Sequence, residues 1–272
     1  MDRSKLLEFF DATDIKKSVH VVGCGAIGSH VCEELARLGF PRVSIYDFDT
    51  VDPHNITNQM FTQTDIGKPK VAACAEAMLA INENIIVNVN NKGLEPPYIL
   101  NGIIILCVDN IDLRREIVKA NRYNPYCDLF LDFRMRLTDA QHYLADAHQP
   151  YQVDNLLNTM DFSHEEAHEA TPTSACGVEL SVVYTVKAIT AFGMANMVNF
   201  LQGNAYKTMV LVNMANYDVS SAMAKPRKIK SSVDRLKATL QPRSDKQAFD
   251  KVSNTQDYKV PPIDLNFKAP PL

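Results

Sequence analysis

The chain has 272 residues, 46% of them hydrophobic, and its formal net charge is −4 at pH 7. This length and composition suffice for one large α/β domain, or for one domain with an appendage. No apolar run approaches the ~20 residues that span a bilayer, and the charged N-terminus has no secretory signal, so we expect a soluble cytoplasmic protein.

The net charge hides an asymmetry between the body of the chain and its C-terminal part. Residues 221–272 carry 11 Lys and Arg against 5 Asp and Glu, whereas residues 1–220 carry 17 against 27. We therefore expect a domain over residues 1–220, followed over 221–272 by a basic, proline-containing tail that is flexible or bound to a partner. Because a short basic run is weak evidence for nucleic acid, we do not expect nucleic-acid binding.

Apolar strands and amphipathic helices alternate through the first half of the chain. Strands are expected at residues 19–23, 42–49, 84–90, 102–110 and 127–133. Helices are expected at residues 26–39, 68–82 and 111–121. Continuous apolar strands that alternate with helices predict a Rossmann-like α/β fold, in which a mostly parallel sheet is covered by helices on both faces.

The pattern changes after the fifth strand. The segments RMRL at residues 134–137 and QHYLAD at residues 141–146 predict an antiparallel extension of the sheet. A polar loop is then expected to about Ala175, and a long apolar helix over residues 178–202, which ends near Gly203.

The sequence VVGCGAIGSH, which begins at Val21, places three glycines where the first strand meets the first helix. There Gly23 allows a tight turn, Gly25 allows a phosphate to approach the backbone, and Gly28 allows the helix to pack on the strand. The unpaired N–H groups at the start of the helix favour an anion. Asp47 ends the second strand, where a carboxylate accepts hydrogen bonds from ribose hydroxyls. These features fit an NAD enzyme, an ATP enzyme or a plain tight turn.

The run DFDTVDPHNITNQMFTQTDIGKPKVAA follows, and it resembles the adenylating family of ThiF, MoeB and the ubiquitin-activating E1 enzymes. That family carries a D-x-D-x-V segment, then S-N-x-x-R-Q, then G-x-P-K at the start of a helix, and the resemblance spans residues 19–132 and returns near Cys176. It implies an enzyme that binds ATP and Mg²⁺ and joins AMP to a carboxylate, chiefly the C-terminus of a small ubiquitin-like protein or peptide. It also implies a homodimer.

The resemblance assigns a role to each matching residue. The residues that would bind the nucleotide are Gly23, Gly25, Gly28, Asp47, Asp49, Asn55, Asn58, Gln59 and Lys70. Lys70 matches the lysine that reaches the triphosphate, and Asp109 matches the aspartate that positions Mg²⁺. Asn55, which matches an asparagine that contacts phosphate, completes the implied catalytic set. Two plainer interpretations stay open, namely Lys70 as a solvated charge and Asp109 with Asn110 as a helix cap.

One departure from the family concerns the arginine that precedes the glutamine, which is here Asn58. A neutral amide cannot supply a charge-assisted contact to the phosphates, and the loss could cost about 2 to 4 kcal/mol at the transition state. Other cations could substitute, and the candidates are Lys68, Arg114, Arg115 and, donated across a dimer, Arg3.

A second departure concerns metal. Many relatives hold a structural zinc with two C-x-x-C pairs, but the six cysteines here are scattered and include no such pair. We therefore expect reduced core thiols and no structural zinc. Zinc-less short forms, such as the ThiF protein of the PRTRC gene system, are the closer resemblance.

Two further segments carry reactive side chains. The letters HEEAH at residues 164–168 match a zinc-protease motif, but the segment is acidic and no third ligand follows at a usual spacing, so we interpret it as a solvated loop. Cys176 lies just before the long apolar helix, where some relatives place a thiol that forms a thioester or persulfide. It is either such a nucleophile, with a pKa lowered by the helix, or a small buried residue.

Two function classes remain. The first is an E1-like adenylyltransferase that uses ATP and Mg²⁺. The second is a nucleotide-binding structural or regulatory protein that kept the fold and lost turnover, for which Asn58 is the main evidence. A dehydrogenase fits less well, because the segment that follows Asp47 does not suit one.

Overall fold

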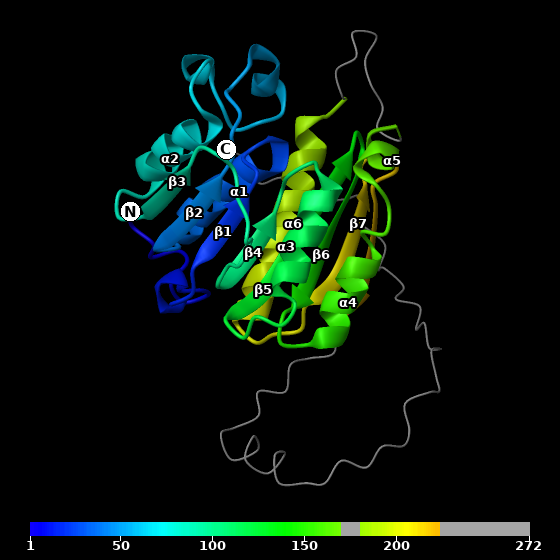
Figure 1. Ribbon diagram of the computed structural model, residues 1–272. Coiled ribbons are helices and arrows are strands. Elements are labelled where there is room, and N and C mark those ends of the chain that lie inside the picture. The colour runs from blue at the N-terminus through cyan, green and yellow to red at the C-terminus, as the bar shows by residue number, and fades with distance from the viewer. Residues whose placement is uncertain (170–179, 224–272) are drawn as a thin grey trace, which may run out of the picture. The chain divides into compact units, whose positions relative to one another are not determined.

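The computed structural model describes residues 1–169 and 180–223, which form a layered α/β domain around one mixed sheet (Figure 1). The eight strands lie in the order β3-β2-β1-β4-β5-β6-β7-β8. Their bounds are β1 Val19–Val22, β2 Arg42–Tyr46, β3 Ile86–Asn90, β4 Gly102–Leu106, β5 Cys127–Arg136, β6 Asp139–Asp146, β7 Lys207–Asn213 and β8 Asp218–Met223. The helices are α1 Ala26–Leu38, α2 Lys70–Ile81, α3 Ile111–Asn121, α4 Pro150–Asn158, α5 His164–Glu169 and α6 Val183–Leu201, with short 3-10 turns η1 Ala12–Asp14, η2 Pro53–Thr57 and η3 Gln63–Asp65.

The first five strands form the parallel half of the sheet. Strand β1 lies between β2 and β4, so that Val21 pairs with Ile45 on one side and with Ile105 on the other. The chain order reverses at β1, because β2 and β3 follow to one side and β4 and β5 to the other. The predicted Rossmann-like, mostly parallel arrangement is confirmed.

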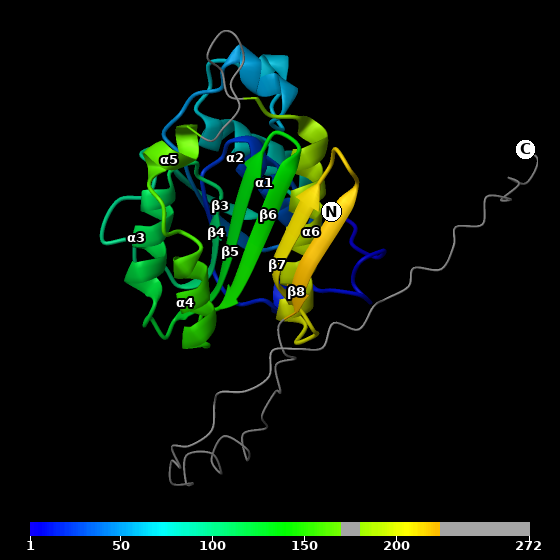
Figure 2. The ribbon, with the colours of Figure 1, turned by 90° about the vertical axis from the view of Figure 1, so that its right-hand side faces the viewer.

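Helices cover both faces of the sheet, which explains why the central strands are apolar at every position. Helices α1, α2 and α6 pack on one face, with α1 in contact with both of the others, and α3 and α4 pack on the opposite face (Figure 2). Alternate residues of β4 supply the two cores, since Ile103 and Ile105 face α1 and α6 whereas Ile104 and Leu106 face α3 and α4.

Three antiparallel strands, β6 to β8, extend the sheet beyond β5, and β6 confirms the predicted antiparallel extension. The segment RMRL, which was expected to belong to this extension, instead continues β5 to Arg136, because the strand runs on past the edge of β4. Strands β7 and β8 were not predicted. Strand β8 is mostly exposed and is held by its backbone pairing with β7, so its side chains carry no apolar pattern.

The polar loop expected before Ala175 is partly wrong. Helix α4 lies within it, begins with Pro150 at its first turn, and buries Val153 and Leu156 against the α3 side of the sheet. Within the described residues α6 begins at Val183 rather than at residue 178. Leu180 to Val182 are not helical, and Val182 has an extended backbone. No helix in residues 1–169 or 180–223 is long and apolar enough to cross a membrane. The boundary after residue 220 stays a prediction.

Candidate nucleotide site

A cavity of ≈ 730 Å³ lies at the carboxyl ends of the parallel strands. Its walls come mainly from the segments that follow β1, β2, β3 and β4, and from the end of β5. In an open α/β sheet this position, outside the strands where the chain order reverses, is where ligands bind. The fold alone therefore predicts that this cavity binds a ligand.

The glycine loop forms one wall of the cavity. Gly23 has a φ of +94°, and a Cβ there would lie 2.7 Å from the backbone nitrogen of Val108. Gly25 is different, because a Cβ at this position would meet no atom within 4 Å and would point into open space. Gly28 does not line the cavity; a Cβ there would lie 1.8 Å from the Gly23 carbonyl oxygen, so this glycine allows the close packing of α1 on the loop.

Two aspartates after β2 are held by defined contacts. The Asp47 carboxylate accepts hydrogen bonds from the backbone N–H groups of Cys24, at 2.6 Å, and of Asp49, at 2.9 Å. The Asp49 carboxylate pairs with the Lys70 ammonium at 2.7 Å, and the Lys70 side chain is only 10% exposed. A short bridge between Thr50 and Pro69 brings the start of α2 next to this segment. All three charged side chains line the cavity.

Three amide residues, in η2 and directly after it, also line the cavity. Asn55 is buried and its side-chain oxygen accepts a hydrogen bond from the backbone N–H of Asp52 at 2.9 Å, which closes the turn. Asn58 ends the turn and faces the cavity. Gln59 also lines the cavity, and its Oε1 is buried with no hydrogen-bond partner in the described part of the chain.

Asp109 follows β4 and is exposed within the cavity wall. The adjacent Asn110, not Asp109, caps α3, since its side-chain oxygen accepts a hydrogen bond from the Leu113 N–H at 3.0 Å. The helix cap therefore does not account for the Asp109 carboxylate. An exposed carboxylate at the end of a parallel strand can bind a hard cation such as Mg²⁺, and phosphate oxygens can bind the same ion.

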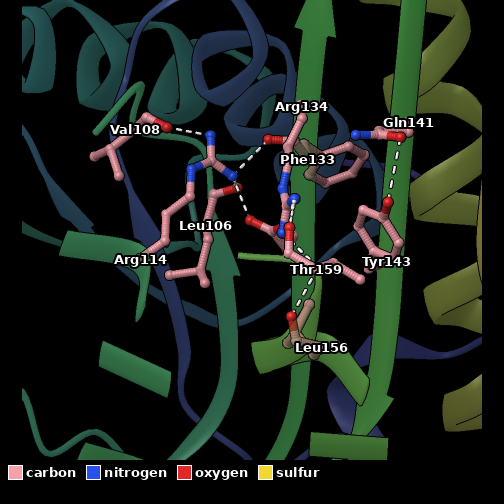
Figure 3. A network of polar contacts seen from close by, with 10 residues as sticks. Leu106, Val108, Arg114, Phe133, Arg134, Gln141, Tyr143, Leu156 and Thr159 are labelled. Atoms are coloured by element: carbon pink, nitrogen blue, oxygen red, sulfur yellow. Dashed lines mark hydrogen bonds and ion pairs between the residues drawn. The ribbon is translucent and has the colours of Figure 1, made fainter. Parts of the chain in front are cut away.

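Arg114 lines the cavity, but its guanidinium is held within the network of polar contacts shown in Figure 3. Its guanidinium donates to the carbonyl oxygens of Phe133, at 2.6 Å, and Val108, and pairs with the buried Asp132 carboxylate. Arg134 shares that carboxylate at 2.7 Å and lies over the Tyr143 ring. The network therefore fixes the end of β5 against the end of β4.

The other cations that the sequence suggested as substitutes lie away from the cavity in this chain. Lys68 pairs with Asp65 and Glu76, Arg115 binds carbonyl oxygens of residues 160 and 162, and Arg3 pairs with Asp11 at 2.8 Å. The lining contains cations that sequence reasoning missed, namely Lys92, Arg134 and Arg136.

A second cavity, of ≈ 550 Å³, adjoins the first. The two share five lining residues, which are Asp109, Arg114, Arg134, Met135 and Arg136. Most of the remaining lining comes from β6, β7 and β8, together with Ile111, Phe162 and His164, so the antiparallel extension forms much of this space. His164 of HEEAH lines this second cavity and begins the six-residue helix α5. The prediction of a solvated loop is therefore wrong, because the backbone of this segment is helical.

The cysteines are less scattered than the sequence suggests. Cys24, Cys32 and Cys74 are buried, and their sulphur atoms all lie within 4.8 Å of one another. Such a cluster could bind zinc, so the expectation of no structural zinc, which rested on the missing C-x-x-C pairs, is not confirmed. Cys176, the predicted thiol nucleophile, lies outside the described residues.

The fold and this cavity define a Rossmann-like protein with a candidate nucleotide site where the strand order reverses. A model of the ThiF family matches residues 11–236. The chain belongs to the ThiF family, and the predicted family resemblance is thereby confirmed, whereas its narrower PRTRC-type, zinc-less form remains a prediction.

Curated relatives match a shorter part of the chain. Ubiquitin-like modifier-activating enzyme 5 of Dictyostelium discoideum is 32% identical over 120 residues, which cover 38% of this chain and 32% of that protein. Molybdopterin-synthase adenylyltransferase of Salmonella typhimurium is 29% identical over 105 residues, which cover 36% of this chain and 42% of that protein. The matches thus span less than half of either relative.

Solved structures share the fold at lower identity. E. coli MccB with ATP superposes with a TM-score of 0.56 at 16% identity, over 79% of this chain and 65% of that chain. Selenomethionine PaaA superposes with a TM-score of 0.59 at 15% identity, over 76% of this chain and 64% of that chain.

Proposed function

We propose that this chain is an ATP-dependent adenylyltransferase that activates a carboxylate as an acyl-adenylate. The observation that carries the proposal is the cavity of ≈ 730 Å³, which the glycine loop, Asp47, Asn55, Lys70 and Asp109 all line. Its volume lies within the range of about 300 to 1,000 Å³ for small-molecule sites. Residues far apart in the sequence meet there in the combination that ATP chemistry requires.

Two features of the cavity fit a bound nucleotide. The space above Gly25 is open where a phosphate would approach the backbone N–H groups at the start of α1. The buried Oε1 of Gln59 has no partner among the described residues, and a buried acceptor without a hydrogen bond is costly until a ligand supplies one. Both features are explained by an occupant with N–H or O–H donors and phosphates.

Lys70 and Asp109 have distinct roles in this proposal. Lys70, positioned by its ion pair with Asp49, would neutralise charge that develops on the leaving pyrophosphate. Asp109 would hold Mg²⁺ through one carboxylate oxygen, which suits an ion that usually keeps water and phosphate as its other ligands. When bound, Mg²⁺ supplies charge neutralisation to the phosphates.

The second cavity is the proposed route for the substrate carboxylate. It opens on the first at Asp109, and Arg134 and Arg136 line both spaces. Asp109, Asp139 and Asp218 line the second cavity as well, so the substrate carboxylate would be bound by a charge-assisted hydrogen bond from an arginine rather than by a net positive charge. The carboxylate oxygen would then form a bond to the α-phosphorus, the α,β phosphorus–oxygen bond would break, and pyrophosphate would leave.

The relatives support a macromolecular carboxylate. The curated relatives include ubiquitin-like modifier-activating enzymes, and MccB has been solved with MccA. We propose that the substrate is the C-terminus of a small ubiquitin-like protein or peptide, that the chain acts as a homodimer, and that it represents a short, PRTRC-like form.

A second candidate function is a nucleotide-binding regulatory protein without turnover. The observation that favours it is Asn58, which faces the cavity where the family places an arginine. The two functions predict the same ATP binding and differ in chemistry.

Exchange of labelled pyrophosphate into ATP separates them. We expect the purified chain to catalyse this exchange with Mg²⁺ and a fraction of host peptides and small proteins. Lys70→Ala should lose most of the exchange rate while still binding ATP, and Asn58→Arg should hold or raise it.

The matched control is Lys68→Ala, because Lys68 neighbours α2 but pairs with Asp65 and Glu76 and, among the described residues, is not part of the cavity lining. Tight ATP binding without exchange, in the wild type and in Asn58→Arg alike, would refute the enzyme and support the regulatory protein.

A further inference from the structure

Three thiols meet directly beneath the glycine loop, although they are far apart in the sequence. Cys24 belongs to the loop itself, Cys32 to the middle of α1, and Cys74 to α2, which packs against α1. All three side chains are 0% exposed, and the three Sγ atoms lie within 4.8 Å of one another. None of them lines the nucleotide cavity.

No disulfide joins the three thiols, because all three cysteines are free. The core residues packed around them are apolar. Three sulphur atoms that lie this close together in an apolar core form a set of soft ligands for a metal ion.

We propose that Cys24, Cys32 and Cys74 bind one soft metal ion through three sulphur atoms, and that the ion is monovalent copper. Thiolates select soft ions such as Cu(I) and Zn(II) over hard ones. A structural zinc site requires four ligands. Within residues 1–169 and 180–223 no His, Asp or Glu atom and no other cysteine joins the three at the same spacing, and three sulphurs alone match the trigonal coordination of Cu(I).

Binding is an exchange of protons for the metal and involves no electron transfer. Each thiol that coordinates the ion loses its proton to solvent, and a copper–sulphur bond forms in its place. One Cu(I) ion offsets one of the three thiolate charges, and the copper–sulphur bonds must offset the cost of burying the remaining charge of −2. The affinity should therefore fall as the pH falls.

The site would link the metal to the nucleotide loop. The backbone N–H of Cys24 donates to the Asp47 carboxylate at 2.6 Å, and Cys24 lies between Gly23 and Gly25. A bound ion would tie this loop to α1 and α2 without entering the cavity. The metal site does not depend on the adenylation proposed above.

The test is an anaerobic titration of the full chain with Cu(I) against a chromophoric copper chelator. The ion is added to the folded protein and, separately, during refolding from urea, so that burial of the thiols does not prevent loading. We expect one ion per chain, a coordination shell of three sulphurs by X-ray absorption, and no tight site for Zn(II). Cys74→Ser should lose the ion.

The matched control is Cys127→Ser, because Cys127 is also a buried free thiol but packs in the core on the α3 side. It should retain the ion. Copper that stays bound in Cys74→Ser, or no retained copper in the wild type by either loading route, would overturn the site. Zn(II) bound with a fourth ligand in place of Cu(I) would overturn the assignment to copper. The X-ray absorption measurement uses the wild type, so it decides the ligand set even where a variant fails to fold.

Discussion

Replacing Gly25 with alanine separates a phosphate-binding loop from a merely tight turn. Gly25 has a φ of −80° and a ψ of −144°, a combination outside the main α and β regions, and the added Cβ would meet no protein atom within 4 Å. Alanine therefore adds backbone strain of about 1 to 3 kcal/mol and is a poorer N-cap residue than glycine, while its restriction of the unfolded chain returns about 0.4 to 1 kcal/mol. We therefore expect Gly25→Ala to lower the free energy of unfolding by about 1 to 2 kcal/mol without a clash in the folded protein.

The same methyl group should weaken ATP binding. It projects into the open space that the phosphates would occupy, and displacing a phosphate from one backbone N–H loses a hydrogen bond to a charged group. Such a bond contributes about 1.5 to 3 kcal/mol, which corresponds to about a 10- to 150-fold rise in Kd. Calorimetric titration with Mg-ATP measures this Kd, and thermal unfolding without nucleotide measures the stability.

Gly28→Ala is the contrasting variant. Its Cβ would lie 1.8 Å from the Gly23 carbonyl oxygen, so backbone must move and the fold itself should lose about 1 to 3 kcal/mol or more. If Gly25→Ala bound Mg-ATP as tightly as the wild type, the loop would not hold the phosphates and the proposed site would be refuted.

Three further predictions concern the cavity and the core beneath it. Lys70→Ala should lower the pyrophosphate-exchange rate by about 100- to 1,000-fold, with a much smaller change in the Kd for ATP; equal losses in both would show a role in binding only. Asp132→Asn should cost about 3 to 5 kcal/mol in urea unfolding, because it leaves the buried Arg114 charge uncompensated. The matched change Asp112→Asn, at a half-exposed ion pair, should cost about 1 kcal/mol or less, and similar costs for the two would contradict the argument. Burial lowers the pKa of His142 from 6.5 to about 4. Between pH 6.5 and 4 the imidazole is therefore protonated in the unfolded chain but neutral in the folded one, so the free energy of unfolding falls as the pH falls through this range. The wild type should lose about 3 kcal/mol more than His142→Gln between pH 6.5 and 4, and parallel pH profiles of the two would contradict the assignment.

The parallel half of the fold was predictable because each strand has a strong local signal. Strand β4, for example, is apolar at every position, and strands and helices alternate along this part of the chain. This pattern predicts a sheet that is buried on both faces. Helix α4 and strand β8 lack such signals. The helix buries few residues, and β8 is held by backbone hydrogen bonds that any sequence can make, so only the tertiary pairing reveals them.

The residues of the candidate site likewise include some that the sequence predicts and some that only the structure reveals. Ordered motifs led to the glycine loop, Asp47, Lys70 and Asp109, because each lies at the end of a parallel strand or the start of a helix, where the fold collects them. Arg136 was missed because β5 continues past the edge of β4, which no motif indicates. The thiol cluster was missed because its ligands come from two helices and a loop, and only the packing of α1 on α2 brings them together.

The charge of the cavity explains why a divalent cation matters for this chain. Three aspartates line the cavity, and they would repel a triphosphate. Two of the lining arginines share the buried Asp132 carboxylate and Lys70 is paired with Asp49, so these three charges are already balanced, whereas Lys92 and Arg136 add two further cations to the lining. A family arginine at Asn58 would add a cation that this chain lacks. The proposed Mg²⁺ at Asp109 therefore supplies a larger share of the charge balance here than it would beside an arginine, and Asn58→Arg should reduce the dependence of ATP binding on Mg²⁺ concentration.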